Sequence, residues 1–141
     1  MKTQATFLNA RKWPLGALAA MAFGTAPFAI AGAGTAEPSI PAAVRLASWQ
    51  DNGQSGRYVL QLAQGRSLPA GERVAGIVTS DSNCEADAQG LSHCHNAIDL
   101  ANGSRIVVIN THQMSRNRCL GTGDRVSLTG AGTSWVLGTL E

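Results

Sequence analysis

The chain has 141 residues, of which 44% are hydrophobic and only 14% are charged. Its formal net charge is +2, but three of the eleven basic residues lie in the first twelve positions, and from Glu37 onward eight arginines face nine carboxylates. A segment with a net charge of −1 lacks the basic surface by which nucleic-acid-binding proteins neutralise phosphates. The same segment holds only three aromatic residues, Trp49, Tyr58 and Trp135, too few for a surface that stacks bases. Nucleic acid is therefore not expected as a partner.

The N-terminal residues have the composition of a secretory signal peptide. Basic residues precede an apolar run over 15–23, and Ala29-Ile30-Ala31 has the A-x-A form that signal peptidase cuts. The apolar run is well below the ~20 residues that a membrane span requires. We therefore expect 1–31 to be a signal peptide, with cleavage at 31 or as late as 36. The mature protein should be periplasmic or secreted, with no membrane span.

The remaining sequence predicts one small β domain. Residues 32–41 are rich in small residues and proline and are expected to form a flexible leader, and 42–141 form the domain. Short apolar segments separated by turn signals every 8–12 residues are typical of an all-β barrel or sandwich. We predict a partly open β-barrel, OB-like or SH3-like, with five to seven short strands. The candidate strands are 44–49, 57–63, 73–79, 92–100, 105–111, 125–129 and 134–140.

Three cysteines, Cys84, Cys94 and Cys119, lie in this domain. In an exported protein an odd number of cysteines indicates one disulfide with one remaining thiol, or an intermolecular bond. The three pairings 84–94, 84–119 and 94–119 are all open on the sequence. A structural disulfide is the expected role for two of the three residues.

The strongest turn signal, Asn102-Gly103, predicts a hairpin between 92–100 and 105–111. Asn-Gly suits a two-residue type I′ turn, because both of its central residues need a positive φ. In that register His93 lies opposite His112, and His95 and Met114 lie two residues along on the same face. A three-residue loop would shift the register by one and place His112 on the opposite face from the other two histidines.

The hairpin suggests a metal site. In a meander, the ends of these strands lie at one end of the domain together with the three cysteines. Imidazole binds zinc and copper, and thioether and thiolate select copper(I). The hypothesis is a site, for copper rather than zinc, with the ligands His93, His95, His112 and Met114. Solvated histidines beside a structural disulfide explain the same residues without a metal.

Catalysis has little support in the sequence. Ser92 and Ser115 lie near histidines but in no nucleophile motif. Cys94 is adjacent to His93 and His95, but neighbouring strand residues point to opposite faces, so neither histidine would activate the thiol easily. The predicted function is therefore metal binding by an exported β domain rather than an enzymatic reaction. The alternative is a disulfide-stabilised binding or structural module of the cell envelope, which recognises an envelope protein and holds no metal.

Overall fold

Six strands run through residues 37–141, the part of the chain that the computed structural model describes. The predicted signal peptide and the first residues of the predicted leader lie outside this part. Six of the predicted strands are present, with ends shifted by three residues at most. They are β1 (Arg57–Gln64), β2 (Val74–Ser82), β3 (Ser92–Leu100), β4 (Arg105–His112), β5 (Arg125–Gly130) and β6 (Trp135–Leu140).

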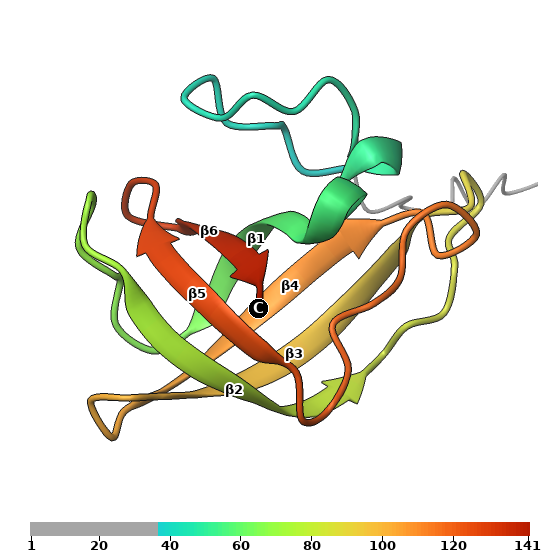
Figure 1. Ribbon diagram of the computed structural model, residues 1–141. Coiled ribbons are helices and arrows are strands. Elements are labelled where there is room, and N and C mark those ends of the chain that lie inside the picture. Colours follow the sequence, from blue (N-terminus) through green and yellow to red (C-terminus); the bar gives the residue numbers. More distant parts are fainter. Residues whose placement is uncertain (1–36) are drawn as a thin grey trace, which may run out of the picture. The chain divides into compact units, whose positions relative to one another are not determined.

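The strands form a closed barrel in the order β1-β4-β3-β2-β5-β6 (Figure 1). Strands β2, β3 and β4 form an antiparallel meander, and β5 and β6 form a hairpin that pairs with β2. Strand β1 completes the ring because it pairs with both β4 and β6. The all-β class and the number of strands are confirmed. The barrel is closed, where the sequence led us to expect a partly open one.

Alternation along each strand separates the interior from the surface. In β3 every second residue is buried, from Ser92 to Leu100, and the residues between them are half-buried. A strand with this pattern points one set of side chains into the barrel and the other set outward. The interior is filled mainly by aliphatic side chains from all six strands together with Tyr58, Leu68 and Leu120.

A second apolar cluster covers the outside of β1 and β6. Its centre is Trp49, which stacks on Trp135 with ring centroids 5.8 Å apart and donates a hydrogen bond from Nε1 to the Pro38 carbonyl at 2.6 Å. Ile40 and Val44 pack against the same cluster. The predicted strand at 44–49 is therefore wrong: this segment packs on the barrel through its side chains, and Trp49 begins a short 3₁₀ helix, η1 (Trp49–Asp51).

The turn between β3 and β4 differs from the predicted one. The strands pair Asp99 with Arg105, and the amide of Leu100 donates to the Ser104 carbonyl at 2.8 Å, so that three residues form the loop. Gly103 has φ +84°, whereas Asn102 does not adopt a positive φ. A type I turn followed by a left-handed glycine accounts for this geometry, and it excludes type I′. The two-residue register is therefore wrong.

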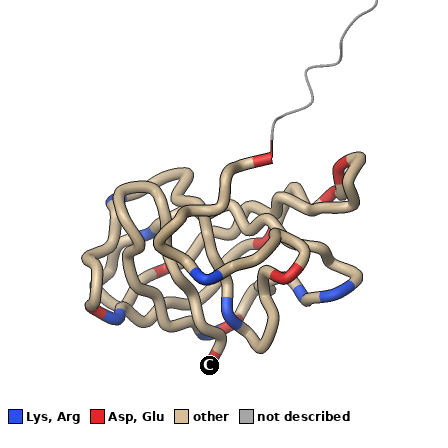
Figure 2. Tube along the Cα trace, turned by 90° about the horizontal axis from the view of Figure 1, so that it is seen from above, with Lys and Arg blue, Asp and Glu red and all other residues tan. Residues whose placement is uncertain are grey.

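Charged side chains are spread over the barrel in both signs, as Figure 2 shows. Several are paired: Asp99 with Arg105, Asp124 with Arg118 at 2.9 Å, and Asp51 with Arg116 at 3.3 Å. Over 37–141 there is no helix with the length and apolar character needed to cross a membrane.

Candidate functional site

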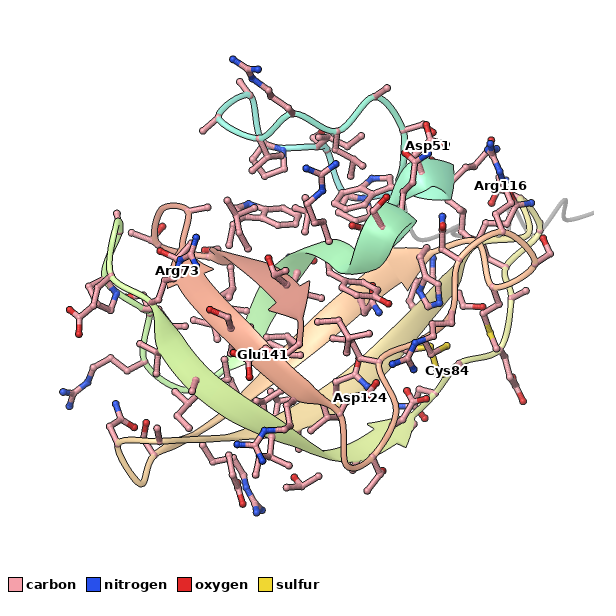
Figure 3. All side chains as sticks on the ribbon, viewed as in Figure 1. Asp51, Arg73, Cys84, Arg116, Asp124 and Glu141 are labelled. Atoms are coloured by element: carbon pink, nitrogen blue, oxygen red, sulfur yellow. A yellow bond between two sulfur atoms is a disulfide. The ribbon has the colours of Figure 1, made fainter. Side chains whose placement is uncertain are left out.

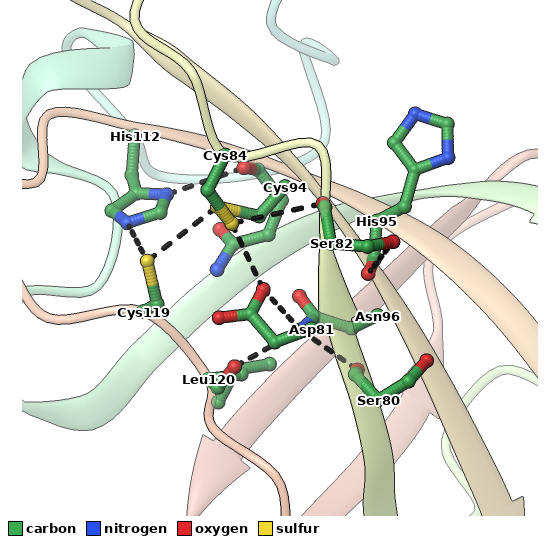
Figure 4. Close-up of a disulfide and its surroundings, with 11 residues drawn as sticks. Ser80, Asp81, Ser82, Cys84, Cys94, His95, Asn96, His112, Cys119 and Leu120 are labelled. Atoms are coloured by element: carbon green, nitrogen blue, oxygen red, sulfur yellow. Dashed lines mark hydrogen bonds between the residues drawn. A yellow bond between two sulfur atoms is a disulfide. The ribbon is translucent and has the colours of Figure 1, made fainter.

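The three cysteines lie close together, as Figure 4 shows, and Figure 3 shows Cys84 at one end of the barrel. Cys84 and Cys94 form a disulfide, and Cys119 is free. The thiol sulfur of Cys119 lies 3.5 Å from Sγ of Cys94. One disulfide with one remaining thiol is the first of the two arrangements that the sequence allowed, and the structure selects the 84–94 pairing from the three that were open.

Different elements position the three sulfurs. Cys94 is an inward-facing residue of β3 and is fully buried. Cys84 lies in the loop that follows β2, and Cys119 lies in the loop between β4 and β5; both are half-buried. The residue after Cys119 is Leu120, whose fully buried side chain anchors that loop in the barrel core. The central sulfur is therefore fixed in the sheet, and the two outer sulfurs are carried by loops.

His112, the last residue of β4, is fully buried and directs one ring nitrogen at the sulfurs. Its Nε2 lies 3.2 Å from Sγ of Cys119, and its Nδ1 lies 3.2 Å from the carbonyl oxygen of Asn110. A carbonyl only accepts hydrogen bonds, so Nδ1 carries the proton and Nε2 presents its lone pair to the thiol. Burial lowers the pKa of His112, which favours this neutral form.

Asp81 reaches the same cluster because of an irregularity in β2. Val78 pairs with Ile98 but Ser80 pairs with Ala97, so Thr79 is an extra residue that forms a β-bulge. The bulge reverses the alternation beyond it. Asp81 therefore lies opposite the inward-facing Asn96, where regular pairing would have placed it on the outer face.

Asn96 holds the carboxylate of Asp81 in place. Its side-chain amide donates to Asp81 Oδ1 at 3.1 Å and to the carbonyl of Leu120 at 2.9 Å. The same Oδ1 lies 3.0 Å from Sγ of Cys84. The carboxylate, the disulfide and the loop of Cys119 are thus tied to one buried amide, as Figure 4 shows.

The geometry of the cluster is compatible with a bound cation. One ligand atom from each of Asp81, Cys84, Cys94 and Cys119 can be chosen so that all four lie within 4.8 Å of one another. Burial raises the pKa of Cys119, the charge of Asp81 raises it further, and Arg118 opposes both effects. The thiol is therefore protonated in the metal-free form and donates to His112. A cation would favour the thiolate, which is the form that binds metals.

His93 lies on the outer face of β3 in a separate hydrogen-bonded group. Its ring nitrogens lie 2.9 Å from Asp87 Oδ2 and 3.0 Å from the hydroxyl of Thr111. The other carboxylate oxygen of Asp87 accepts from the amide of Leu91 at 2.9 Å. The hydrogen bond from His93, followed by that from Leu91, lowers the pKa of Asp87. This group fastens the loop before β3 to the barrel.

The four predicted ligands do not lie on one face. His93 and His95 share the outer face of β3, as alternation predicts, and His95 points away from the sulfurs (Figure 4). His112 points inward, because the three-residue loop pairs it with Ser92 rather than with His93. Met114 lies beyond the end of β4 and is half-exposed. Of the predicted ligands, the structure places only His112 beside the cysteines.

No family model, curated protein or solved structure matches this chain significantly. The chemistry of the cysteine cluster therefore carries the functional argument.

Proposed function

We propose that this protein is an exported β-barrel domain that binds a soft metal ion, copper(I) in the first place, through its cysteine cluster. The ligands would be the thiolates of Cys84, Cys94 and Cys119 and Nε2 of His112. The observation that carries the proposal is that the three sulfurs and a carboxylate oxygen of Asp81 lie within 4.8 Å of one another, with Nε2 of His112 3.2 Å from the sulfur of Cys119. Export is supported by the basic and apolar N-terminal sequence.

The disulfide makes the proposed binding dependent on redox state. In the oxidised form two of the three sulfurs are bonded to each other, and a disulfide sulfur is a poor ligand compared with a thiolate. Reduction would supply all three thiolates beside the imidazole. Thiolates select copper(I) and zinc, and the reducing conditions that open the disulfide also keep copper in the cuprous state. This coincidence favours copper(I), although three cysteines and one histidine also suit tetrahedral zinc.

The surroundings of His112 support its role as a ligand. Metal-binding histidines usually donate their second ring N–H to a carbonyl or carboxylate, which fixes the ring and its tautomer. The hydrogen bond from Nδ1 of His112 to the Asn110 carbonyl has this form, and it leaves Nε2 unprotonated on the side of the sulfurs. Asp81, held by Asn96, adds a negative charge next to the proposed cation.

The proposal is tested by titrating the reduced and the oxidised protein with copper(I) and zinc(II) under anaerobic conditions, in competition with chromophoric chelators. The reduced protein should bind one equivalent of copper(I), and the oxidised protein should bind far more weakly. His112→Ala should weaken metal binding by ~10-fold or more, because the site would lose an imidazole whose orientation is fixed by a hydrogen bond. The matched control is His95→Ala, which removes an imidazole of the outer face and should leave the affinity unchanged.

Two outcomes would contradict the proposal. If His95→Ala or His93→Ala weakened binding and His112→Ala did not, the ligands would lie on the outer face of β3. If neither oxidation state bound metal more tightly than a variant without cysteines, the disulfide-stabilised module would be the better description. If the reduced protein bound zinc(II) more tightly than copper(I), the metal assignment would change to zinc, and the site would stay the same.

A further inference from the structure

The free thiol of Cys119 lies against a disulfide. Its Sγ is 3.5 Å from Sγ of Cys94, which is close to the contact distance of two sulfur atoms, and no other residue separates them. Cys94 is therefore within reach of two partners, the sulfur to which it is bonded and the sulfur that it touches. We infer that the protein carries out an internal thiol–disulfide exchange, in which Cys94 passes from Cys84 to Cys119.

The exchange is balanced without an oxidant or a reductant. The Cys119 thiol gives its proton to His112 Nε2, the acceptor 3.2 Å away, and the thiolate attacks Sγ of Cys94. The Cys94–Cys119 bond forms while the Cys84–Cys94 bond breaks, and the bonding electrons leave on Cys84. The Cys84 thiolate takes up a proton from solvent, and His112 releases the one that it accepted. One disulfide and one thiol are present before and after.

The surroundings of Cys84 suit it as the leaving sulfur. It is half-buried in the loop after β2, so solvent reaches it and can protonate it. Asp81 Oδ1, 3.0 Å from its sulfur, can accept a hydrogen bond from the new S–H group. Cys94, by contrast, is fully buried in β3 and can stay in place during the exchange. Only the two loop residues need to adjust.

The exchange would change what the protein presents to other molecules. In the observed form the free thiol is that of Cys119, directed at His112 inside the cluster. After the exchange the free thiol would be that of Cys84, on a loop beside the exposed residues Asn83 and Glu85. A thiol in that position can form a mixed disulfide with an external thiol or disulfide compound. The exchange would thus move the free thiol from a position directed into the cluster to one on the loop after β2.

This inference does not depend on the proposed metal binding, since no ion takes part in the exchange. The experiment uses the full chain freed of metal by a chelator and incubated at neutral pH. Samples are acidified at intervals, denatured with excess N-ethylmaleimide, digested without reduction and analysed by mass spectrometry. We expect label on Cys84 as well as on Cys119, and peptides linked 94–119 as well as 84–94.

Two variants provide controls. In Cys84→Ser, incubation of the folded protein with oxidised glutathione should join Cys94 to Cys119, so that the thiol count falls from two per chain to none. In Cys119→Ser, the 84–94 bond should persist and no thiol should be labelled, which shows that the digestion does not scramble disulfides. His112→Ala should slow the appearance of label on Cys84 without changing the set of products.

The inference would be overturned if Cys84 remained unlabelled in the natural sequence at all times. It would also be overturned if folded Cys84→Ser kept two thiols or only captured glutathione, because the two sulfurs would then be unable to bond. Should Cys84→Ser fail to fold, the labelling of the natural sequence decides alone. A protein that exchanges but binds no metal would refute the proposed function and leave the exchange standing.

Discussion

Reducing the Cys84–Cys94 disulfide should lower the stability of the barrel by an amount that follows from the length of the loop it closes. The two cysteines are ten residues apart. In the chain-entropy model, a loop of this length restricts the unfolded chain by about 9 cal/mol/K, or about 2.7 kcal/mol at 25 °C. For a domain of this size, that corresponds to a fall in melting temperature of about 10–20 °C.

The assay compares one chain in two states. The Cys119→Ala variant is used because its remaining cysteines can only pair with each other, so that the internal exchange proposed above cannot replace the lost bond. Its unfolding by urea is measured with and without a thiol-free reductant. The reduced form should have the lower unfolding free energy and a larger dependence on urea, since its unfolded state is less compact.

The double variant Cys84→Ala/Cys119→Ala shows whether the reductant itself affects stability, because it contains no disulfide to reduce. A difference of less than about 0.5 kcal/mol between the unfolding free energies of oxidised and reduced Cys119→Ala would refute the loop-entropy reasoning. Removal of a native disulfide typically costs about 2–5 kcal/mol. Recovery of the lost stability of the reduced natural sequence by copper(I) would add independent support to the metal proposal, because a ligand that binds only the folded state stabilises it.

Three further predictions concern the barrel that supports the site. Asn52→Ala should lower the unfolding free energy by about 2–4 kcal/mol, because this buried amide makes three hydrogen bonds of 2.7–2.9 Å to buried backbone groups; a loss below about 1 kcal/mol in urea unfolding would contradict this. Gly130→Ala should destabilise by about 1–3 kcal/mol or more, because the added Cβ would overlap the carbonyl oxygen of Leu68, and an unchanged melting temperature would refute it. The hydrogen bond from Arg118 lowers the pKa of Asp124. The ionised Asp124 therefore stabilises the folded state above the ordinary carboxyl pKa, and this stabilisation is lost as the pH falls through the lowered value. Asp124→Asn should therefore flatten the acid side of the stability profile, and an identical profile would show that this pair contributes nothing.

The strands were predictable because their signals are local. Alternating or apolar residues bounded by glycine, asparagine and proline lie at β1 to β6, and the structure has strands there. The segment 44–49 has the same local signal but no free strand edge to join. Trp49 instead packs on the outside of the barrel against Trp135, which is a long-range contact that no local pattern reveals.

The site was harder to predict, because it depends on register. Asn102-Gly103 is compatible with a two-residue and a three-residue loop, and the choice decides whether His112 joins the histidines of β3 or the cysteines. The flanking residues 106–109 are apolar at every position, so burial on one face could not decide the register. The contribution of Asp81 had no signal in the sequence, since nothing around Thr79 marks a bulge.

The bulge in β2 makes the position of one carboxylate depend on the number of residues in the strand. Thr79 has no partner on β3, so deleting it would leave a regular ladder in which Asp81 still lies opposite Asn96. If Thr79 were kept and paired regularly with β3, Asp81 would instead lie opposite His95 and its carboxylate would turn away from Cys84. The carboxylate therefore stays beside the disulfide when the extra residue bulges out or is absent, and it is lost from the cluster only when the extra residue enters the ladder.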